Sequence, residues 1–168
     1  MESYIVVDLE MTGLHPKKAR ILEIGAVRVE DGGITDMFHR MVNPHMRLSK
    51  DITDLTGITD EMVSGGCDCA EAVGEFLEFA DGFALAGHNL IFDYAFLKQS
   101  AVNQGISLQK KGIDTLKLAR KFLPEAEKKS LDYLCEYFGI TREKEHRALE
   151  DAKATAQLLQ IILIKLKL

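Results

Sequence analysis

The first 42 residues contain three strand-forming runs, and this restricts the chain to folds that begin with consecutive strands. Runs rich in β-branched residues occupy about residues 4–10, 20–29 and 34–42. Asp31-Gly32-Gly33 supplies the turn chemistry between the second and third runs, because glycine reaches positive φ without strain. Together the three successive strands predict an antiparallel meander.

After residue 49 the pattern changes to helices that alternate with short strands. Serine caps and apolar spacings of three and four residues predict the helices, and short apolar runs predict buried strands. The expected helices cover residues 49–55, 59–63, 69–80, 89–103, a segment ending near 123, 130–138 and a last helix opening near 146; the expected strands cover 83–87 and 113–115. A stripe along the last helix is expected to face the core: Leu149, Ala152, Ala156, Leu159, Leu163 and Leu166. Antiparallel strands followed by alternating strands and helices predict an α/β protein with a mixed sheet covered by helices.

Length and composition are those of one globular domain, expected to span residues 1–168. The chain is 46% hydrophobic and 28% charged, and none of its apolar runs approaches the roughly 20 residues of a membrane helix. Met1-Glu2-Ser3 lacks the basic region of a signal peptide, so a cytoplasmic location is expected. Cys67, Cys69 and Cys135 suit a reducing compartment, and a structural or incidental role is expected for them.

The net charge of −5 argues against tight binding along duplex nucleic acid, where many phosphates must be neutralised. It leaves room for an enzyme that holds a few nucleotides. Acidic residues gathered around divalent cations would contribute to this negative charge, and the bound ions would offset it.

Two carboxylates end the first predicted strand. Asp8 and Glu10 are two residues apart, and side chains alternate along a strand, so both point to the same face. A solvated strand end is the alternative interpretation. Asp93 and Asp151 fall near the starts of two predicted helices, where the helix dipole favours an acid without any catalytic role.

Four carboxylates that converged on one edge of the sheet would repel one another unless cations lay between them. Such hard oxygen ligands suit Mg²⁺ or Mn²⁺. Two ions about 4 Å apart can align an attacking water and stabilise a leaving oxygen in phosphodiester cleavage. His146, just before the last helix, could act as general base for that water or could be a surface cap residue. The sequence permits this convergence and does not establish it.

Three segments, in order, resemble the motifs of the DnaQ-like 3′–5′ exonuclease family, in the subclass with four acidic ligands and a histidine base. VVDLEMTGL resembles the first motif, HNLIFD the second and HRALEDA the third. ARILEIGAV, MVNP, LTGITDEMV and SLDYLCEYFGI resemble connecting segments, so the resemblance covers roughly residues 4 to 160. It implies an RNase H-like, exonuclease-type fold with a mixed five-stranded sheet flanked by helices.

The resemblance also implies roles for individual residues. Two Mg²⁺ or Mn²⁺ ions would be held by Asp8, Glu10, Asp93 and Asp151, and His146 would deprotonate the attacking water. Contacts with the 3′ end of the substrate are implied for Leu9, Glu10, Thr12, Gly13, Leu14, His88, Asn89, Phe92 and His146. In this set Leu14 is an apolar wedge against the terminal bases and Phe92 lines the pocket of the terminal nucleotide, since bases offer faces for stacking. The loop Leu55–Ile58 matches a segment near the bound strand.

The leading hypothesis is a 3′–5′ exonuclease that releases nucleoside 5′-monophosphates from single-stranded DNA. DLEMTGL resembles oligoribonucleases, whereas HNLIFDYAFL and LTGIT resemble proofreading exonucleases and the exonuclease domains of bacterial replicative polymerases. Degradation of short RNA is therefore an alternative, because no residue settles whether the site accepts a 2′-hydroxyl. A polymerase-associated subunit that mainly binds is a further alternative, although the chain ends with its last helix and no docking tail is expected. Expected partners are a single-stranded 3′ end, a nucleoside monophosphate product and, as a candidate, a DNA polymerase; the oligomeric state stays open.

Several neighbouring residues are expected to have no catalytic role. Glu23 lies in the segment that resembles EIGAV and is expected to be structural. His15, His39 and His45 have no carboxylate or cysteine partner at metal-binding spacing, so surface positions are expected. The pairs Lys110-Lys111 and Lys128-Lys129 are expected to form solvated surface.

Overall fold

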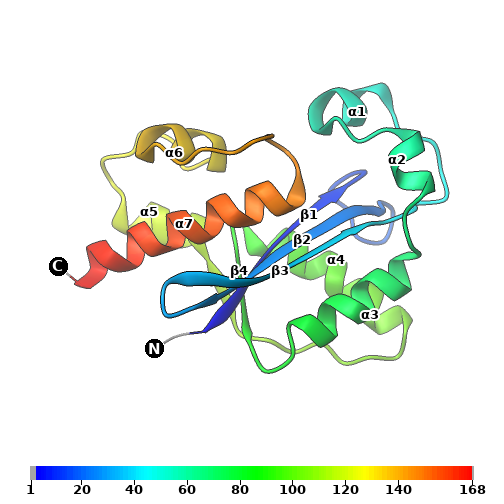
Figure 1. The fold of residues 1–168 in the computed structure, drawn as a ribbon, viewed down its shortest axis with the longest axis horizontal. Helices are drawn as coiled ribbons and strands as arrows, with labels where there is room; N and C mark the ends of the chain where they lie inside the picture. Colours follow the sequence, from blue (N-terminus) through cyan, green and yellow to red (C-terminus); the bar gives the residue numbers. More distant parts are fainter. Residues whose placement is uncertain (1–2, 168) are drawn as a thin grey trace.

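The computed structural model describes residues 3–167 and contains one mixed five-stranded sheet with helices on both faces (Figure 1). The strands are β1 (Tyr4–Met11), β2 (Ile21–Glu30), β3 (Gly33–Met41), β4 (Ala84–Gly87) and β5 (Gly112–Asp114). Their order is β3-β2-β1-β4-β5, with β1 in the centre. The first three strands pair antiparallel, and β4 and β5 continue the sheet in parallel. The predicted meander and mixed sheet are confirmed.

The predicted helices are all present, with ends shifted by one or two residues. They are α1 (Lys50–Thr56), α2 (Asp60–Ser64), α3 (Cys69–Phe79), α4 (Leu90–Asn103), α5 (Thr115–Phe122), α6 (Leu131–Phe138) and α7 (Ala148–Lys167). Figure 1 shows α5, α6 and α7 on one side of the sheet and α3 and α4 on the other. Among residues 3–167 no helix is both long and apolar enough to cross a membrane.

The alternation of β1 assigns its side chains to the two faces of the sheet. Ile5, Val7 and Leu9 are buried in the cluster that includes the core residues of α3 and α4. Tyr4 and Val6 are buried against α7 instead. Asp8 and Glu10 have the parity of Tyr4 and Val6, so they face α7 where β1 ends.

The helix α7 crosses the sheet closely enough to need a glycine beneath it. A Cβ added at Gly25 of β2 would lie 2.2 Å from the backbone nitrogen of Leu149. Distances of that kind do not occur between non-bonded atoms, so only glycine lets the first turn of α7 lie directly on β2. This contact places the start of α7 over the end of β1.

The predicted core stripe of α7 is partly correct. Ala152, Ala156 and Leu159 are buried, and Leu149 and Leu163 are half-buried. Leu166 is 46% exposed, contrary to the prediction, because the last turn of α7 extends beyond the sheet (Figure 1). A second buried row, Ala154, Leu158 and Ile162, packs in the cluster formed with α5 and α6. The helix is therefore covered on two sides, which a single-stripe interpretation does not anticipate.

Candidate active site

Three of the four predicted carboxylates meet where β1 ends beneath α7. Carboxylate oxygens of Asp8, Glu10 and Asp151 all lie within 4.8 Å of one another. Asp151 is buried in the first turn of α7, and the two strand residues are half-buried. They line a hollow of about 280 Å³ together with Leu9, His88, Leu131, Asp132 and His146. The structure thus brings residues from both ends of the chain to one cavity.

Asp93 lies beside this cluster and is fixed by the backbone. Its Oδ1 accepts a hydrogen bond from the backbone N–H of Leu9 at 3.0 Å, and its side chain is buried. Asp93 is not one of the three residues whose oxygens lie within 4.8 Å of one another. Its charge nevertheless acts on Asp8, as the pKa of that carboxyl shows.

Burial and mutual repulsion oppose ionisation throughout the cluster. Burial, and then the charges of Asp93 and Glu10, hold the pKa of Asp8 well above its usual value. Burial and the charges of Asp151 and Glu23 raise the pKa of Glu10 to about 9. Burial also raises the pKa of Asp93 to about 7, despite the hydrogen bond from Leu9. Carboxylates in such a site bind protons or cations to relieve the repulsion.

Arg142 donates hydrogen bonds to one acid of the cluster, Asp151, and to the neighbouring Asp132, a role that the sequence did not indicate. Its Nη1 donates to Asp151 Oδ1 at 2.8 Å and its Nη2 donates to Asp132 Oδ1 at 2.8 Å, while the side chain is only 4% exposed. Burial raises the pKa of Asp151, and the hydrogen bond from Arg142 opposes that rise. Arg142 lies between α6 and α7 in a segment without periodic pattern, so nothing local in the sequence marks it.

His146 lines the same hollow just before α7 begins. Its side chain is 35% exposed, and its Nε2 lies 3.6 Å from Asp132 Oδ2. The residue has a φ of 54°, in the left-handed region that side chains with a Cβ rarely adopt. The ring is thus placed at the mouth of the cavity with an acid beside it.

His88 reaches the cavity, but both of its ring nitrogens are engaged by the protein. Nδ1 lies 2.8 Å from Thr115 Oγ1, and Nε2 lies 2.8 Å from the carbonyl oxygen of Lys129. Burial lowers the pKa of His88, which is consistent with a neutral ring whose Nε2–H donates to Lys129. The next residue, Asn89, has a φ of 62°, and its backbone N–H donates to Asp114 Oδ1. The two residues connect the ends of β4 and β5.

The loop after β1 is closed by Thr12 and presents an apolar tip. The backbone N–H of Thr12 donates to the carbonyl of Arg20, and the backbone N–H of Arg20 donates to Thr12 Oγ1, both at 2.9 Å. Gly13 lies under Ala19, whose Cβ would be 3.3 Å from an added Cβ. Leu14 is 72% exposed, and Phe92 in the first turn of α4 is 38% exposed. Leu14, the predicted wedge, and Phe92, the predicted wall of the nucleotide pocket, are therefore accessible to a ligand.

Glu23 is structural, as expected, and its network includes a histidine that was expected at the surface. Its carboxylate is 1% exposed and accepts hydrogen bonds from Arg147 and from the backbone N–H of Ala148. Burial opposes its ionisation, but the hydrogen bonds with His39, Arg147 and Ala148 outweigh burial and lower its pKa to about 2. Glu23 thereby ties the start of α7 to β2.

The predictions for histidines and lysines were partly correct. His45 is exposed at the surface, as predicted, and His39 is half-buried. Each nevertheless has a carboxylate partner in the fold, since His39 Nε2 lies 2.7 Å from Glu23 and His45 Nε2 lies 2.7 Å from Asp68. These partners are 16 and 23 residues away, beyond the short spacings that sequence patterns record. Lys110 donates to the carbonyls of Ala80 and Phe83, and Lys129 donates to the carbonyl of Ala126, so neither is merely solvated.

The sheet order, the central strand that ends in two acids and the helix that supplies a third define an α/β protein of the RNase H-like exonuclease type. The family model RNase_T, described as an exonuclease, matches residues 5–159, and the chain belongs to this family. The predicted resemblance to DnaQ-like exonucleases is confirmed.

Curated relatives are similar over nearly the whole chain. The PolC-type DNA polymerase III of Clostridium perfringens is 39% identical over 166 residues, which are 99% of this chain and 12% of that protein. The PolC-type DNA polymerase III of Bacillus subtilis is 40% identical over 161 residues, which are 94% of this chain and 11% of that protein. The chain therefore spans only about a ninth to an eighth of the length of these relatives.

Solved structures share the fold. Exonuclease X, solved with 5′-overhanging duplex DNA, matches with a TM-score of 0.79 and 26% identity, covering 98% of this chain and 93% of that one. E. coli exonuclease I, solved with a dT13 oligonucleotide, matches with a TM-score of 0.86 and 17% identity, covering 99% of this chain and 42% of that one.

Proposed function

We propose that this chain is a metal-dependent 3′–5′ exonuclease that removes nucleoside 5′-monophosphates from the 3′ end of single-stranded DNA. The observation that carries the proposal is the convergence of Asp8, Glu10 and Asp151, whose oxygens lie within 4.8 Å of one another. Membership of the exonuclease family and the PolC-type relatives support the same activity.

The residues fit a pair of divalent cations. The four carboxylates Asp8, Glu10, Asp93 and Asp151 supply only oxygen ligands, which Mg²⁺ and Mn²⁺ prefer. The raised pKa values of Asp8 and Glu10 come from burial and from neighbouring negative charge, and a bound cation relieves both. When bound, the ions would supply an activated water and charge stabilisation at the leaving oxygen.

Residues of the chain perform the remaining steps. His146, at the mouth of the cavity, accepts the proton of the attacking water. Asp132, 3.6 Å from its Nε2, stabilises the imidazolium that results. Arg142 holds Asp132 and Asp151 at 2.8 Å each, and so keeps the base and one metal ligand in fixed relation.

The exposed apolar side chains of Leu14 and Phe92, which do not line the cavity of the carboxylates, position the 3′ terminus. Leu14 and Phe92 are accessible from different segments, and each offers an apolar surface to the face of a base. Thr12, held to Arg20 through both its backbone and its hydroxyl, fixes the loop that carries Leu14. The ring nitrogens of His88 are bonded to the protein, so its contribution is to hold this edge of the site in place.

The experiment that tests the proposal uses a 20-nucleotide single strand with a fluorescent label at its 5′ end. With Mg²⁺, the wild type should produce a ladder that shortens from the 3′ end, and EDTA should abolish it. Asp8→Asn and Asp151→Asn should each reduce the rate by at least about 10²-fold, because each removes an anionic ligand. Asp54→Asn, an exposed residue on α1 paired with Lys50, is the control and should keep the wild-type rate. Undiminished activity in both site variants would overturn the proposal.

Short RNA is the second candidate substrate, and the motif DLEMTGL is the observation that favours it. We place single-stranded DNA first because the relatives are DNA polymerases of the PolC type. Rates on matched DNA and RNA oligomers of two and twenty nucleotides distinguish the two. Faster turnover of the RNA dinucleotide than of either DNA would favour the second candidate.

We also propose residues 1–168 as one exonuclease domain that works beside a DNA polymerase in the cytoplasm. The support is that the chain matches a small part of polymerases in its relatives. Copurification of a polymerase with the tagged chain tests the partnership, and its absence from a replication-active extract would count against it.

A further inference from the structure

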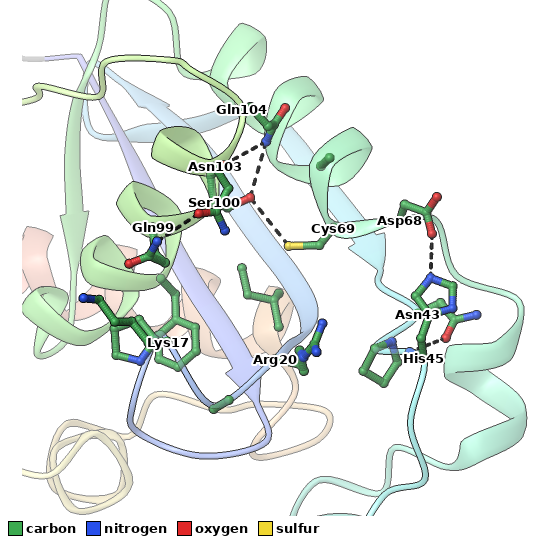
Figure 2. Close-up of a pocket in the computed structure, with 16 residues that line it drawn as sticks. Lys17, Arg20, Asn43, His45, Asp68, Cys69, Gln99, Ser100, Asn103 and Gln104 are labelled. Atoms are coloured by element: carbon green, nitrogen blue, oxygen red, sulfur yellow. Dashed lines mark hydrogen bonds and ion pairs between the residues drawn. The ribbon is translucent and has the colours of Figure 1, made fainter.

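A larger hollow lies on the other side of the loop that carries Leu14. This distal hollow has a volume of about 710 Å³ and lies between the loop residues 16–21, the segment 43–45, the start of α3 and the helix α4 (Figure 2). Its size is that of a ligand site, and none of the steps proposed above uses it. The residues labelled in Figure 2 come from four separate parts of the chain and surround it.

The lining of the distal hollow carries positive charge that forms no ion pair among the described residues. Lys17 and Arg20 are exposed, and within residues 3–167 no carboxylate forms an ion pair with either side chain. The one acid in the lining, Asp68, is already engaged by His45 at 2.7 Å. Amide side chains complete the wall on the α4 side, where Gln99 Nε2 donates to Asn103 Oδ1 and Gln104 Nε2 donates to Ser100 (Figure 2). The positive charge of the lining therefore comes from Lys17 and Arg20. Exposed cations without a carboxylate partner are suited to phosphate oxygens.

A third hollow connects the distal hollow to the loop residues Thr12–Leu14, which are predicted to contact the 3′ terminus. It has a volume of about 510 Å³ and is lined by residues 12–15, 18 and 19 on one side and by residues 46–49 and 52 on the other. Ala19 lines both hollows, and segments 43–45 and 46–49 are consecutive in the chain. The two hollows therefore form one trough between the same two segments. Lys18 and Arg47 add positive charge along it.

We propose that the distal hollow binds the phosphodiester backbone of the single strand upstream of the terminal nucleotide. This inference rests on the proposed function, since it gives the strand whose 3′ end reaches the carboxylates a path along the trough. Lys17 and Arg20 contact phosphates there without reading the bases, because cations recognise the backbone and not the sequence. A chain with a net charge of −5 thus concentrates its strand-binding cations in one trough.

The test compares the double variant Lys17→Gln/Arg20→Gln with the double variant Lys98→Ala/Lys121→Ala. The control removes the same amount of charge from exposed positions outside the trough. In the Lys17→Gln/Arg20→Gln variant, the KM for a 20-nucleotide single strand should rise about tenfold. The KM for a dinucleotide should rise by a smaller factor. The slope of log KM against log salt should become shallower by about 1.4, since each lost phosphate contact removes about 0.7 on a single strand.

Equal KM values and equal salt slopes for the two double variants on the 20-nucleotide strand would overturn the proposal. An equal rise in KM for the dinucleotide would overturn it too, because the lost contact would then belong to the terminal nucleotide. Fluorescence anisotropy of the labelled 20-nucleotide strand on Asp8→Asn protein, with and without Lys17→Gln/Arg20→Gln, measures the same contacts without turnover. This measurement shows whether Lys17 and Arg20 bind the strand even if the protein does not hydrolyse it.

Discussion

Replacing Glu10 by glutamine should stabilise the metal-free protein while it abolishes activity. Burial and the charges of Asp151 and Glu23 raise the pKa of Glu10 to about 9. The folded protein therefore keeps a proton on Glu10 that the unfolded chain has lost above its ordinary pKa. Since the folded state binds more protons, stability falls as pH rises from about 4.5 towards 9.

The magnitude follows from the interval between the ordinary pKa and the working pH. At pH 7 that interval is about 2.5 units, equivalent to about 3 kcal/mol if the site were dry. Glu10 is half-buried, and screening by water reduces the penalty to about 1–2 kcal/mol. Glutamine has the same shape and no charge, so Glu10→Gln should raise the Tm by about 2–8 °C in a domain of this size.

The assay is thermal unfolding in EDTA at pH 7.5 and at pH 5. The gain should be present at pH 7.5 and much smaller at pH 5, where the carboxyl is protonated in the folded state and still about a quarter protonated in the unfolded state. Mg²⁺ should raise the Tm of the wild type more than that of the variant, because binding to the folded state stabilises by mass action.

The matched control is Glu23→Gln on the neighbouring strand. Glu23 lies directly opposite Glu10 in the β1–β2 ladder, but its pKa is lowered to about 2 by hydrogen bonds that outweigh its burial. A lowered pKa contributes stability above about pH 4.5 that is lost as pH falls towards 2. Glu23→Gln should therefore destabilise by about 3–5 kcal/mol at pH 7.5, since it breaks a buried ion pair. If both glutamine variants lost stability in EDTA at pH 7.5, the electrostatic reasoning would be refuted.

Three further predictions concern the packing of α7 on β2, the ion pair of Arg142 and the contacts with the substrate. Gly25→Ala should destabilise by at least about 3 kcal/mol in thermal unfolding, because its Cβ would lie 2.2 Å from the Leu149 backbone nitrogen; a loss under 1 kcal/mol would contradict the close packing of α7. Arg142→Ala should cost about 3–5 kcal/mol by leaving the buried carboxylate of Asp151 unpaired, with a smaller loss for Arg142→Lys, measured by urea unfolding; an unchanged midpoint would contradict it. Leu14→Ala and Phe92→Ala should each raise the KM for single-stranded DNA by about tenfold at unchanged Tm, since each removes an exposed contact worth about 1–3 kcal/mol; a lower Tm with unchanged KM would indicate packing instead.

Local patterns were sufficient to predict the elements of the fold. Ser49 and Ser130 were read as helix caps, and each side chain accepts a hydrogen bond from the backbone N–H three residues on. Gly139 follows the predicted helix 130–138 and has a φ of 67°, the left-handed conformation that glycine adopts where a helix ends. The period of two in β1 placed Asp8 and Glu10 on one face. These features depend on neighbours within a few residues, which the sequence states directly.

The side chains that surround the site could not be predicted, because their partners are distant in the sequence. Arg142 meets Asp132 and Asp151 only after α6 and α7 have packed together. His39 reaches Glu23 because β2 and β3 pair in one particular register. No periodicity of one element encodes a contact between two elements, so the family resemblance implied which acids surround the site, and nothing in the sequence indicated the arginine and histidine side chains that bind its acids and Glu23.

The engagement of His88 is a finding of the same kind. The motif implies a residue that contacts the substrate, and the ring lines the hollow of the carboxylates, but its ring nitrogens are bonded to Thr115 and to the carbonyl of Lys129. The partners lie 27 and 41 residues further along the chain. A motif identifies a residue type at a position, and only tertiary structure decides what its polar atoms bind.

Anomalous diffraction from crystals soaked with Mn²⁺ and a nucleoside 5′-monophosphate tests the proposed site most directly. We expect two manganese peaks among Asp8, Glu10, Asp93 and Asp151, about 4 Å apart as in two-metal sites, with the phosphate of the nucleotide between them. Peaks should be lost in crystals of Asp8→Asn protein prepared in the same way. A single peak at the exposed group Asp132, Glu145 and His146, with none at the end of β1, would contradict the proposed mechanism.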